Sequence, residues 1–188
     1  MTDTLIKLDA VEAGYAKPIV GPISLSINRG QIVGLVGQNG SGKSTLLKAI
    51  ADSARIFNGR IERTPGVTVA LMEQEPVRLH GMPFNGWEYL RFAGASRSAP
   101  PSRLTSWLDQ RVDSLSGGQF QLLSCWTALG SSAEVILLDE PTNNLDEDSE
   151  AMLTEILAGD HVDRAILLVS HDQAFVESVS DQIIAVGR

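Results

Sequence analysis

A glycine-rich segment between an apolar stretch and a helical one constrains the fold of this chain more than any other feature. Residues 37–45 read Gly-Gln-Asn-Gly-Ser-Gly-Lys-Ser-Thr and follow Gln31–Val36, which is dense in apolar residues. Leu46 and Ile50 then mark a helix. Glycines let several backbone N–H groups curl toward phosphate oxygens. The order strand, loop, helix therefore predicts a phosphate-binding loop, whereas an ordinary glycine turn that caps a helix is the alternative.

The residues of this loop have distinct expected roles. We expect Lys43 to reach the β- and γ-phosphates of a nucleotide and the Ser44 hydroxyl to bind Mg²⁺. The residues assigned to the phosphate site are Gly37, Asn39, Gly40, Ser41, Gly42, Lys43, Ser44 and Thr45.

Two carboxylates follow a second apolar strand. Asp139 and Glu140 come directly after Val135–Leu138. A carboxylate at the carboxyl end of a central strand can hold Mg²⁺ through water, and the next can polarise an attacking water. Asp139 is thus the expected metal residue and Glu140 the expected general base. A strand that simply leaves the core through charged residues is the alternative.

A second anion site is predicted at Leu115–Gln119, which reads Leu-Ser-Gly-Gly-Gln. Ser116 is expected to cap the helix that follows, and Gly117 and Gly118 expose backbone N–H groups at its start. The alternative is an ordinary helix N-cap with a flexible lead-in.

The rest of the chain alternates strands and helices, which predicts an α/β fold with a mainly parallel sheet. The length of 188 residues fits one domain, residues 1–188. Glycines and prolines between 76 and 130 predict a short helical subdomain there. The further expected strands are Ile23–Ile27, Val67–Met72, Ala165–Val169 and Gln182–Val186, and the expected helices are 147–157 and 173–179. Ile23–Ile27 alternates apolar and polar residues and predicts a small antiparallel portion with one wet face.

Composition limits the partners. The net charge of −8 argues against direct binding of DNA. The single cysteine, Cys125, indicates a reducing compartment and is expected to act as a small apolar helix residue. Met1–Leu5 lacks the start of a signal peptide, and no run of about 18 apolar residues predicts a membrane span. We therefore expect a cytoplasmic protein; if it works at a membrane, it lies peripherally on the inner face by docking on a partner chain.

Several aromatic and histidine side chains lie outside these motifs. Trp87, Trp107 and Trp126 are expected to pack in the core or the helical subdomain, and His80 and His161 are expected at the surface.

The motifs, in this order, resemble the ATP-binding cassette (ABC) ATPases over nearly the whole chain. The resemblance implies a P-loop NTPase fold and Mg²⁺-dependent ATP hydrolysis by two cassettes that pair head to tail, so that Ser116–Gln119 binds the γ-phosphate held by the other cassette. It also assigns five further residues. Tyr15 stacks on adenine, Thr45 contacts the α-phosphate, Gln74 contacts Mg²⁺ or water, Asp146 belongs to the loop Pro141–Asp146 at the dimer interface, and His171 contacts the γ-phosphate.

The work done by the ATPase has three possible settings. A single cassette without membrane helices fits a transporter that pairs with a transmembrane subunit, which is the preferred interpretation. Thr142–Asp146 and Val169–Asp172 are more similar to the ABC-F branch, whose members act on ribosomes; this is the alternative. The helix at Phe120–Trp126 also lacks the arginines usual in transporters. A DNA-maintenance ATPase is disfavoured, because the segment between the Lys43 loop and Leu115 is too short to hold long coiled coils. The chain ends at Arg188, just after a strand, so a shortened C-terminus stays open.

Overall fold

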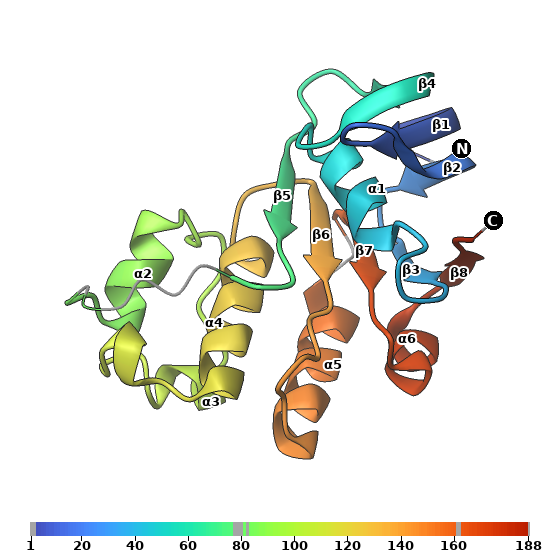
Figure 1. The fold of residues 1–188 in the computed structure, drawn as a ribbon. Helices are drawn as coiled ribbons and strands as arrows, with labels where there is room; N and C mark the ends of the chain where they lie inside the picture. Colours follow the sequence, from blue (N-terminus) through green and yellow to red (C-terminus); the bar gives the residue numbers. More distant parts are fainter. Residues whose placement is uncertain (1–2, 77–80, 82, 161–162, 188) are drawn as a thin grey trace.

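A five-stranded parallel sheet forms the centre of the protein, whose computed structural model describes residues 3–76, 81, 83–160 and 163–187. The strand order is β5–β6–β7–β3–β8 (Figure 1). The strands are β3 (Ile32–Val36), β5 (Val69–Met72), β6 (Val135–Asp139), β7 (Ala165–Val169) and β8 (Gln182–Ala185). All the pairings between them are parallel, which confirms the predicted α/β class.

The central strands are buried on both faces. Every residue of β6 and β7 is buried, and successive residues enter different cores. Ile136 and Leu138 join the core on one face, while Val135 and Leu137 join the core on the other. This division explains why the strands read as continuous apolar runs instead of alternating sequences.

Helices cover both faces, as predicted. They are α1 (Lys43–Ile50), α4 (Gly117–Leu129), α5 (Glu147–Asp160) and α6 (Gln173–Val179). Leu123 of α4, Leu153 of α5 and Phe175 of α6 share the core of Ile136. On the other face, Leu47 of α1 packs in the second core, together with residues of a second sheet.

The second sheet is antiparallel, with the strand order β2–β1–β4 in the part of the chain that the structure describes. Its strands are β1 (Thr4–Gly14), β2 (Pro18–Asn28) and β4 (Arg55–Arg63). The prediction found only the second half of β2, at Ile23–Ile27, and missed β1 and β4. Register shifts interrupt the pairing of β1 with both neighbours, and β4 is mostly exposed and polar. Neither strand therefore carries a clean apolar alternation.

Short helices occupy the stretch expected to form the helical subdomain, 76–130. They are α2 (Gly86–Phe92), α3 (Ser102–Thr105) and a 3-10 helix at Val112–Ser114, all beside α4 (Figure 1). Leu104 and Leu108 are fully buried in the same core as Ile136 of the sheet. Because this core is shared, a separate subdomain stays a prediction.

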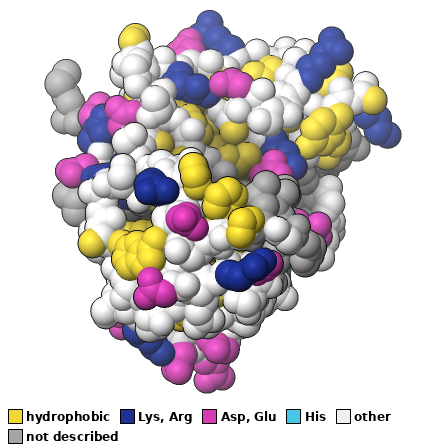
Figure 2. All heavy atoms as spheres, turned by 90° about the vertical axis from the view of Figure 1, so that its left-hand side faces the viewer, with side chains coloured by type: hydrophobic (Ala, Val, Ile, Leu, Met, Phe, Trp, Pro, Cys, Tyr) yellow, Lys and Arg dark blue, Asp and Glu magenta, His cyan; other side chains and the backbone are white. Residues whose placement is uncertain are grey.

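The aromatic predictions have mixed outcomes. Trp107 and Trp126 are buried as expected. Trp87, expected in the core or the helical subdomain, lies on α2 of that stretch and is 42% exposed, so it is not a core residue. Helix α2 turns Gly86 and Leu90 inward, and Trp87 lies beside that face. Figure 2 views this side of the molecule and shows hydrophobic side chains in separate groups among charged ones. His80 and His161 lie outside the described residues.

Cys125 is a buried residue of α4, as predicted. Burial raises the pKa of its thiol to about 12. Among the described residues, no helix combines the length and the apolar character that crossing a bilayer requires.

Candidate functional site

The glycine loop takes a backbone path that requires glycine. Gly42 is left-handed, with φ of 92°, and precedes the first residue of α1. A Cβ atom there would lie 2.6 Å from Cβ of Val20, so any side chain would clash. The N-cap Gly42 supplies no side-chain hydrogen bond, so the first N–H groups of α1 lack a side-chain cap. Such N–H groups suit a phosphate.

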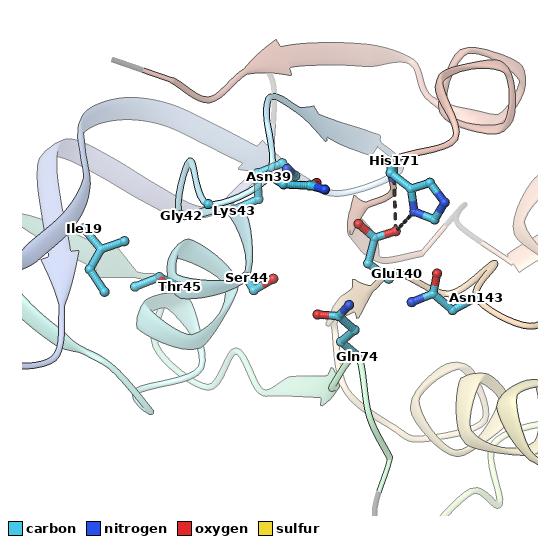
Figure 3. A pocket seen from close by; sticks show the side chains of 11 residues that line it. Ile19, Asn39, Gly42, Lys43, Ser44, Thr45, Gln74, Glu140, Asn143 and His171 are labelled. Carbon is cyan, nitrogen blue, oxygen red and sulfur yellow. Dashed lines mark hydrogen bonds and ion pairs between the residues drawn. The ribbon is translucent and has the colours of Figure 1, made fainter.

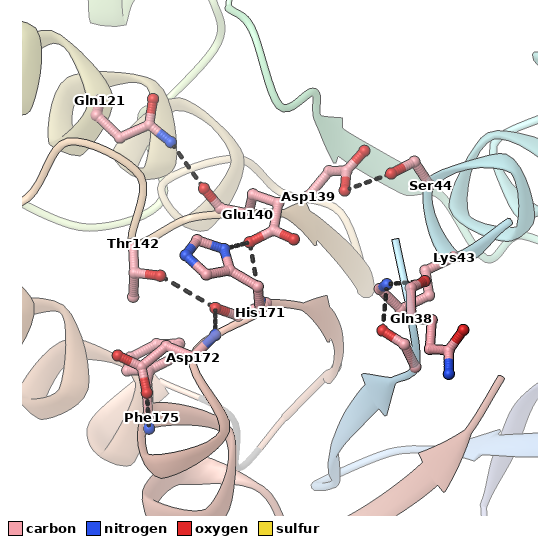
Figure 4. Close-up of polar contacts among 12 residues, drawn as sticks. Gln38, Lys43, Ser44, Gln121, Asp139, Glu140, Thr142, His171, Asp172 and Phe175 are labelled. Atoms are coloured by element: carbon pink, nitrogen blue, oxygen red, sulfur yellow. Dashed lines mark hydrogen bonds and ion pairs between the residues drawn. The ribbon is translucent and has the colours of Figure 1, made fainter. Parts of the chain in front are cut away.

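Lys43 lies beneath this loop. The residue is 7% exposed, and its Nζ donates to the carbonyl oxygens of Gly37 at 2.8 Å and Gln38 at 3.1 Å (Figure 4). These contacts hold a positive charge at the wall of a cavity of about 520 Å³.

That cavity brings together most of the predicted site residues. The loop and α1 form one side, and the ends of β5, β6 and β7 form the other (Figure 3). The lining residues are Ile19, Asn39, Gly40, Gly42, Lys43, Ser44, Thr45, Gln74, Glu140, Asn143 and His171. Ile19 and Asn143 were missed as individual residues. Asn143 lies inside the predicted interface loop 141–146, whereas the sequence around Ile19 carries no signal.

Ser44 and Asp139 form a polar pair beside this cavity. The Ser44 hydroxyl donates to Oδ1 of Asp139 at 2.9 Å. Burial raises the pKa of Asp139, and the charge of Glu140 raises it further, while the bond from Ser44 opposes the shift. Hydroxyl, carboxylate and amide oxygens are the ligands that Mg²⁺ prefers, usually together with phosphate oxygens. The hydroxyl of Ser44 and the carboxylate of Asp139 therefore suit Mg²⁺ bound beside a phosphate.

Asp139→Asn should stabilise the chain at neutral pH when nucleotide and divalent metal are absent. Folding raises the pKa of Asp139, so the folded state binds the carboxyl proton more tightly than the unfolded state does. The folded state therefore loses stability as the pH rises from the pKa of the unfolded chain to that of the folded chain. The amide removes this cost and still accepts the bond from Ser44. Thermal unfolding with a chelator should give a higher midpoint for the variant at pH 7 and a smaller difference at pH 4. The exposed Asp109→Asn is the control, and a lower midpoint for Asp139→Asn at pH 7 would contradict the argument.

Glu140 and His171 meet at the carboxyl edge of the sheet. Asp139 at the end of β6 pairs with Val169 at the end of β7, so the residues that follow lie side by side. Oε2 of Glu140 accepts the backbone N–H of His171 at 3.0 Å and lies 2.8 Å from His171 Nδ1 (Figure 3). The Glu140 side chain is 10% exposed. The pair directs a carboxylate into the cavity opposite Ser44.

Glu140 also has an unusual backbone. Its φ is 51°, in the left-handed region that residues other than glycine seldom adopt. Such conformations concentrate at functional sites, where the surrounding structure imposes them.

The predicted second anion site lies in a different cavity. Ser116 caps α4, as predicted: its Oγ accepts the Gln119 N–H at 3.1 Å, and the Gln119 side chain accepts the Ser116 N–H at 2.9 Å. A cavity of about 780 Å³ is lined here by residues that include Ser116, Gly117, Gly118, Gln119, Asn144 and Asp146. Asp146 also caps α5, since its Oδ1 accepts the Ser149 N–H at 2.9 Å. One chain therefore keeps the two predicted phosphate sites apart.

Tyr15 stands outside both cavities. The residue is 51% exposed in the turn between β1 and β2, and it lines neither cavity. Its stacking on adenine stays a prediction.

Comparison with known proteins gives consistent matches. A family described as "ABC transporter" matches residues 20–143. The zinc import ATP-binding protein ZnuC of Cereibacter sphaeroides is 35% identical over 90% of this chain and 73% of its own length. The protein of that name from Roseobacter denitrificans is 33% identical over 98% of this chain and 76% of its own length. A solved ATP-binding subunit of an ABC transporter superposes with a TM-score of 0.84 at 25% identity, covering 98% of this chain and 86% of that one.

Proposed function

The chain belongs to the ABC transporter family, and we propose that it hydrolyses ATP in the cavity around Lys43, with Glu140 as the general base. It is an ATPase subunit that energises a membrane transporter. The observation that carries the catalytic proposal is the single cavity in which the Lys43 loop faces the Glu140–His171 pair.

The roles of the residues follow from their positions. Lys43 and the loop N–H groups bind the phosphates and offset the charge that develops on the transferred phosphoryl group. Glu140 takes the proton of the attacking water. Because both contacts from His171 fall on Oε2, we assign that proton to Oε1. When bound, Mg²⁺ supplies positive charge against the phosphate oxygens, and Ser44, Asp139 and Gln74 are the residues that would hold it.

A second copy completes each site in this proposal. Ser116–Gln119 presents the start of α4 to a cavity that the Lys43 loop of the same chain does not line. A head-to-tail pair would bring this helix start to the γ-phosphate bound by the other copy. Asp146 and the rest of the loop 141–146 would then lie at the interface, and Tyr15 would stack on adenine.

The proposed cargo of the transporter is a zinc ion. Support comes from relatives that are named zinc import ATP-binding proteins. The transmembrane partner would hold the cargo, and this chain would dock peripherally on the cytoplasmic side. The ABC-F-like alternative rests on the local similarity of Thr142–Asp146 and Val169–Asp172 and on the missing arginines of Phe120–Trp126, and these relatives give it no support.

Fractionation of the trapped protein tests the transport proposal. Tagged Glu140→Gln, expressed in the native host and supplied with Mg-ATP, should be recovered with an integral membrane protein. Glu140→Gln combined with Lys43→Ala is the matched control, because its much weaker binding of ATP should lower the recovery of the complex. Loss of radioactive zinc uptake on deletion of the gene, restored by the wild-type chain alone, would support the cargo. Recovery with ribosomes would contradict transport, and unchanged zinc uptake would contradict zinc as the cargo.

A further inference from the structure

A buried glutamine on α4 contacts the backbone of Glu140. Gln121 is 4% exposed, and its Nε2 donates to the Glu140 carbonyl oxygen at 3.1 Å (Figure 4). The same oxygen accepts the N–H of Asn143 at 3.2 Å. Two donors from different elements therefore fix the orientation of this peptide group.

The orientation of this peptide group matters because Glu140 is left-handed, with φ of 51°. A residue held in this region returns to an ordinary conformation when the contacts that impose it are lost. Such a change would swing the Cβ atom, and with it the carboxylate that lies against His171. The hydrogen bond from the Gln121 amide is thus one of the contacts that orient the Glu140 carboxylate.

Helix α4 packs closely along the loop after Glu140. A Cβ atom on Gly118 would lie 2.8 Å from the Asn144 carbonyl oxygen, and Sγ of Cys125 lies 3.8 Å from the Pro141 carbonyl oxygen. Gln121 stands between these two contacts on the helix. The segment from Glu140 to Asn144 is therefore fitted against the first turns of α4.

We propose that Gln121 is a positioning residue for ATP hydrolysis, acting through the carbonyl group of Glu140. The proposal rests on the proposed function of Glu140 as the base. It also gives α4 a second role: the helix that lines the second cavity with Ser116–Gln119 holds the base of the first cavity in the same chain. If α4 moves when a phosphate binds at its first turn, the orientation of the Glu140 carboxylate would change.

Gln121→Met tests the proposal, because methionine keeps the volume and removes the donor. The purified chain should hydrolyse Mg-ATP with a kcat about tenfold lower, as expected for a misplaced catalytic group. Its Kd for ATP should change by less than about twofold, since the lost contact acts on the chemical step. Thr127→Val is the control from the same helix, and it should keep the wild-type kcat, because Thr127 Oγ1 donates within its own helix, to the Ser124 carbonyl oxygen.

A double variant separates positioning from general damage. Single-turnover hydrolysis by Glu140→Gln should be unchanged when Gln121→Met is added, since both substitutions act on one group. A wild-type kcat for Gln121→Met, or an equal loss in both backgrounds, would overturn the role of Gln121. Wild-type hydrolysis by Glu140→Gln alone would instead overturn the assignment of the base. If Gln121→Met does not fold, Gln121→Leu, which also removes the donor, takes its place.

Discussion

Glu140→Gln should lower the rate of ATP hydrolysis by about 10²- to 10⁴-fold, the usual contribution of a general base. The amide keeps the shape of the carboxylate and can still accept the N–H of His171, but it does not take a proton from water. ATP binding should persist, because the phosphates are held by the loop and Lys43. With hydrolysis blocked, ATP should hold two chains together. Turnover is measured by phosphate release, and the mass of the particle by light scattering with and without Mg-ATP.

The matched control is Glu147→Gln, which makes the same change at an exposed residue at the start of α5. It should leave turnover and particle mass at wild-type values. Wild-type turnover by Glu140→Gln would refute the assignment of the base. A particle that stays a monomer with ATP bound would contradict the shared site.

Lys43→Ala should weaken ATP binding by about 3 kcal/mol, about 150-fold in Kd, which is typical when one partner of a buried charge pair is removed. Lys43 is the lining residue of the phosphate cavity that carries a fixed positive charge, and its Nζ is already held at the loop by Gly37 and Gln38. Binding is measured by isothermal titration calorimetry with Mg-ATP.

Lys48→Ala is the control for this prediction, because Lys48 lies on the same helix and pairs with Glu73 at 3.5 Å. It removes an equal charge without touching the cavity and should change Kd by less than about twofold. Equal losses in both variants would mean that the effect of Lys43 is a general effect of net charge.

The sequence predicts the buried parallel strands well because both of their faces are apolar. The predicted limits of β7 and α6 agree with the structure, whereas α5 continues past Leu157 to Asp160 and β5 begins at Val69 instead of Val67. The antiparallel strands β1 and β4 were not predicted, because bulges and polar residues interrupt the alternation of apolar and polar residues that marks a strand. Pattern arguments detect burial on two faces more readily than an irregular exposed edge.

The site was predicted as a set of residues but not as a geometry. The order of the motifs named Lys43, Ser44 and His171, and the structure brings them to one cavity. The contact of His171 with Glu140 depends on the register of β6 with β7, which no local pattern reveals. The left-handed backbone of Glu140 has no sequence signal, because glutamate seldom adopts it.

Because Cys125 is the single cysteine and is buried, the unmodified chain is a suitable starting point for labelling at introduced cysteines. Thiols react as thiolates, and the only cysteine of the sequence is buried with a pKa of about 12. Maleimides and bifunctional thiol reagents should therefore leave the unmodified protein untouched. Asn39→Cys on the loop and Ser116→Cys at the start of α4 would each introduce one reactive handle at one cavity. A covalent link between two such chains would report, without any measurement of turnover, whether those surfaces meet.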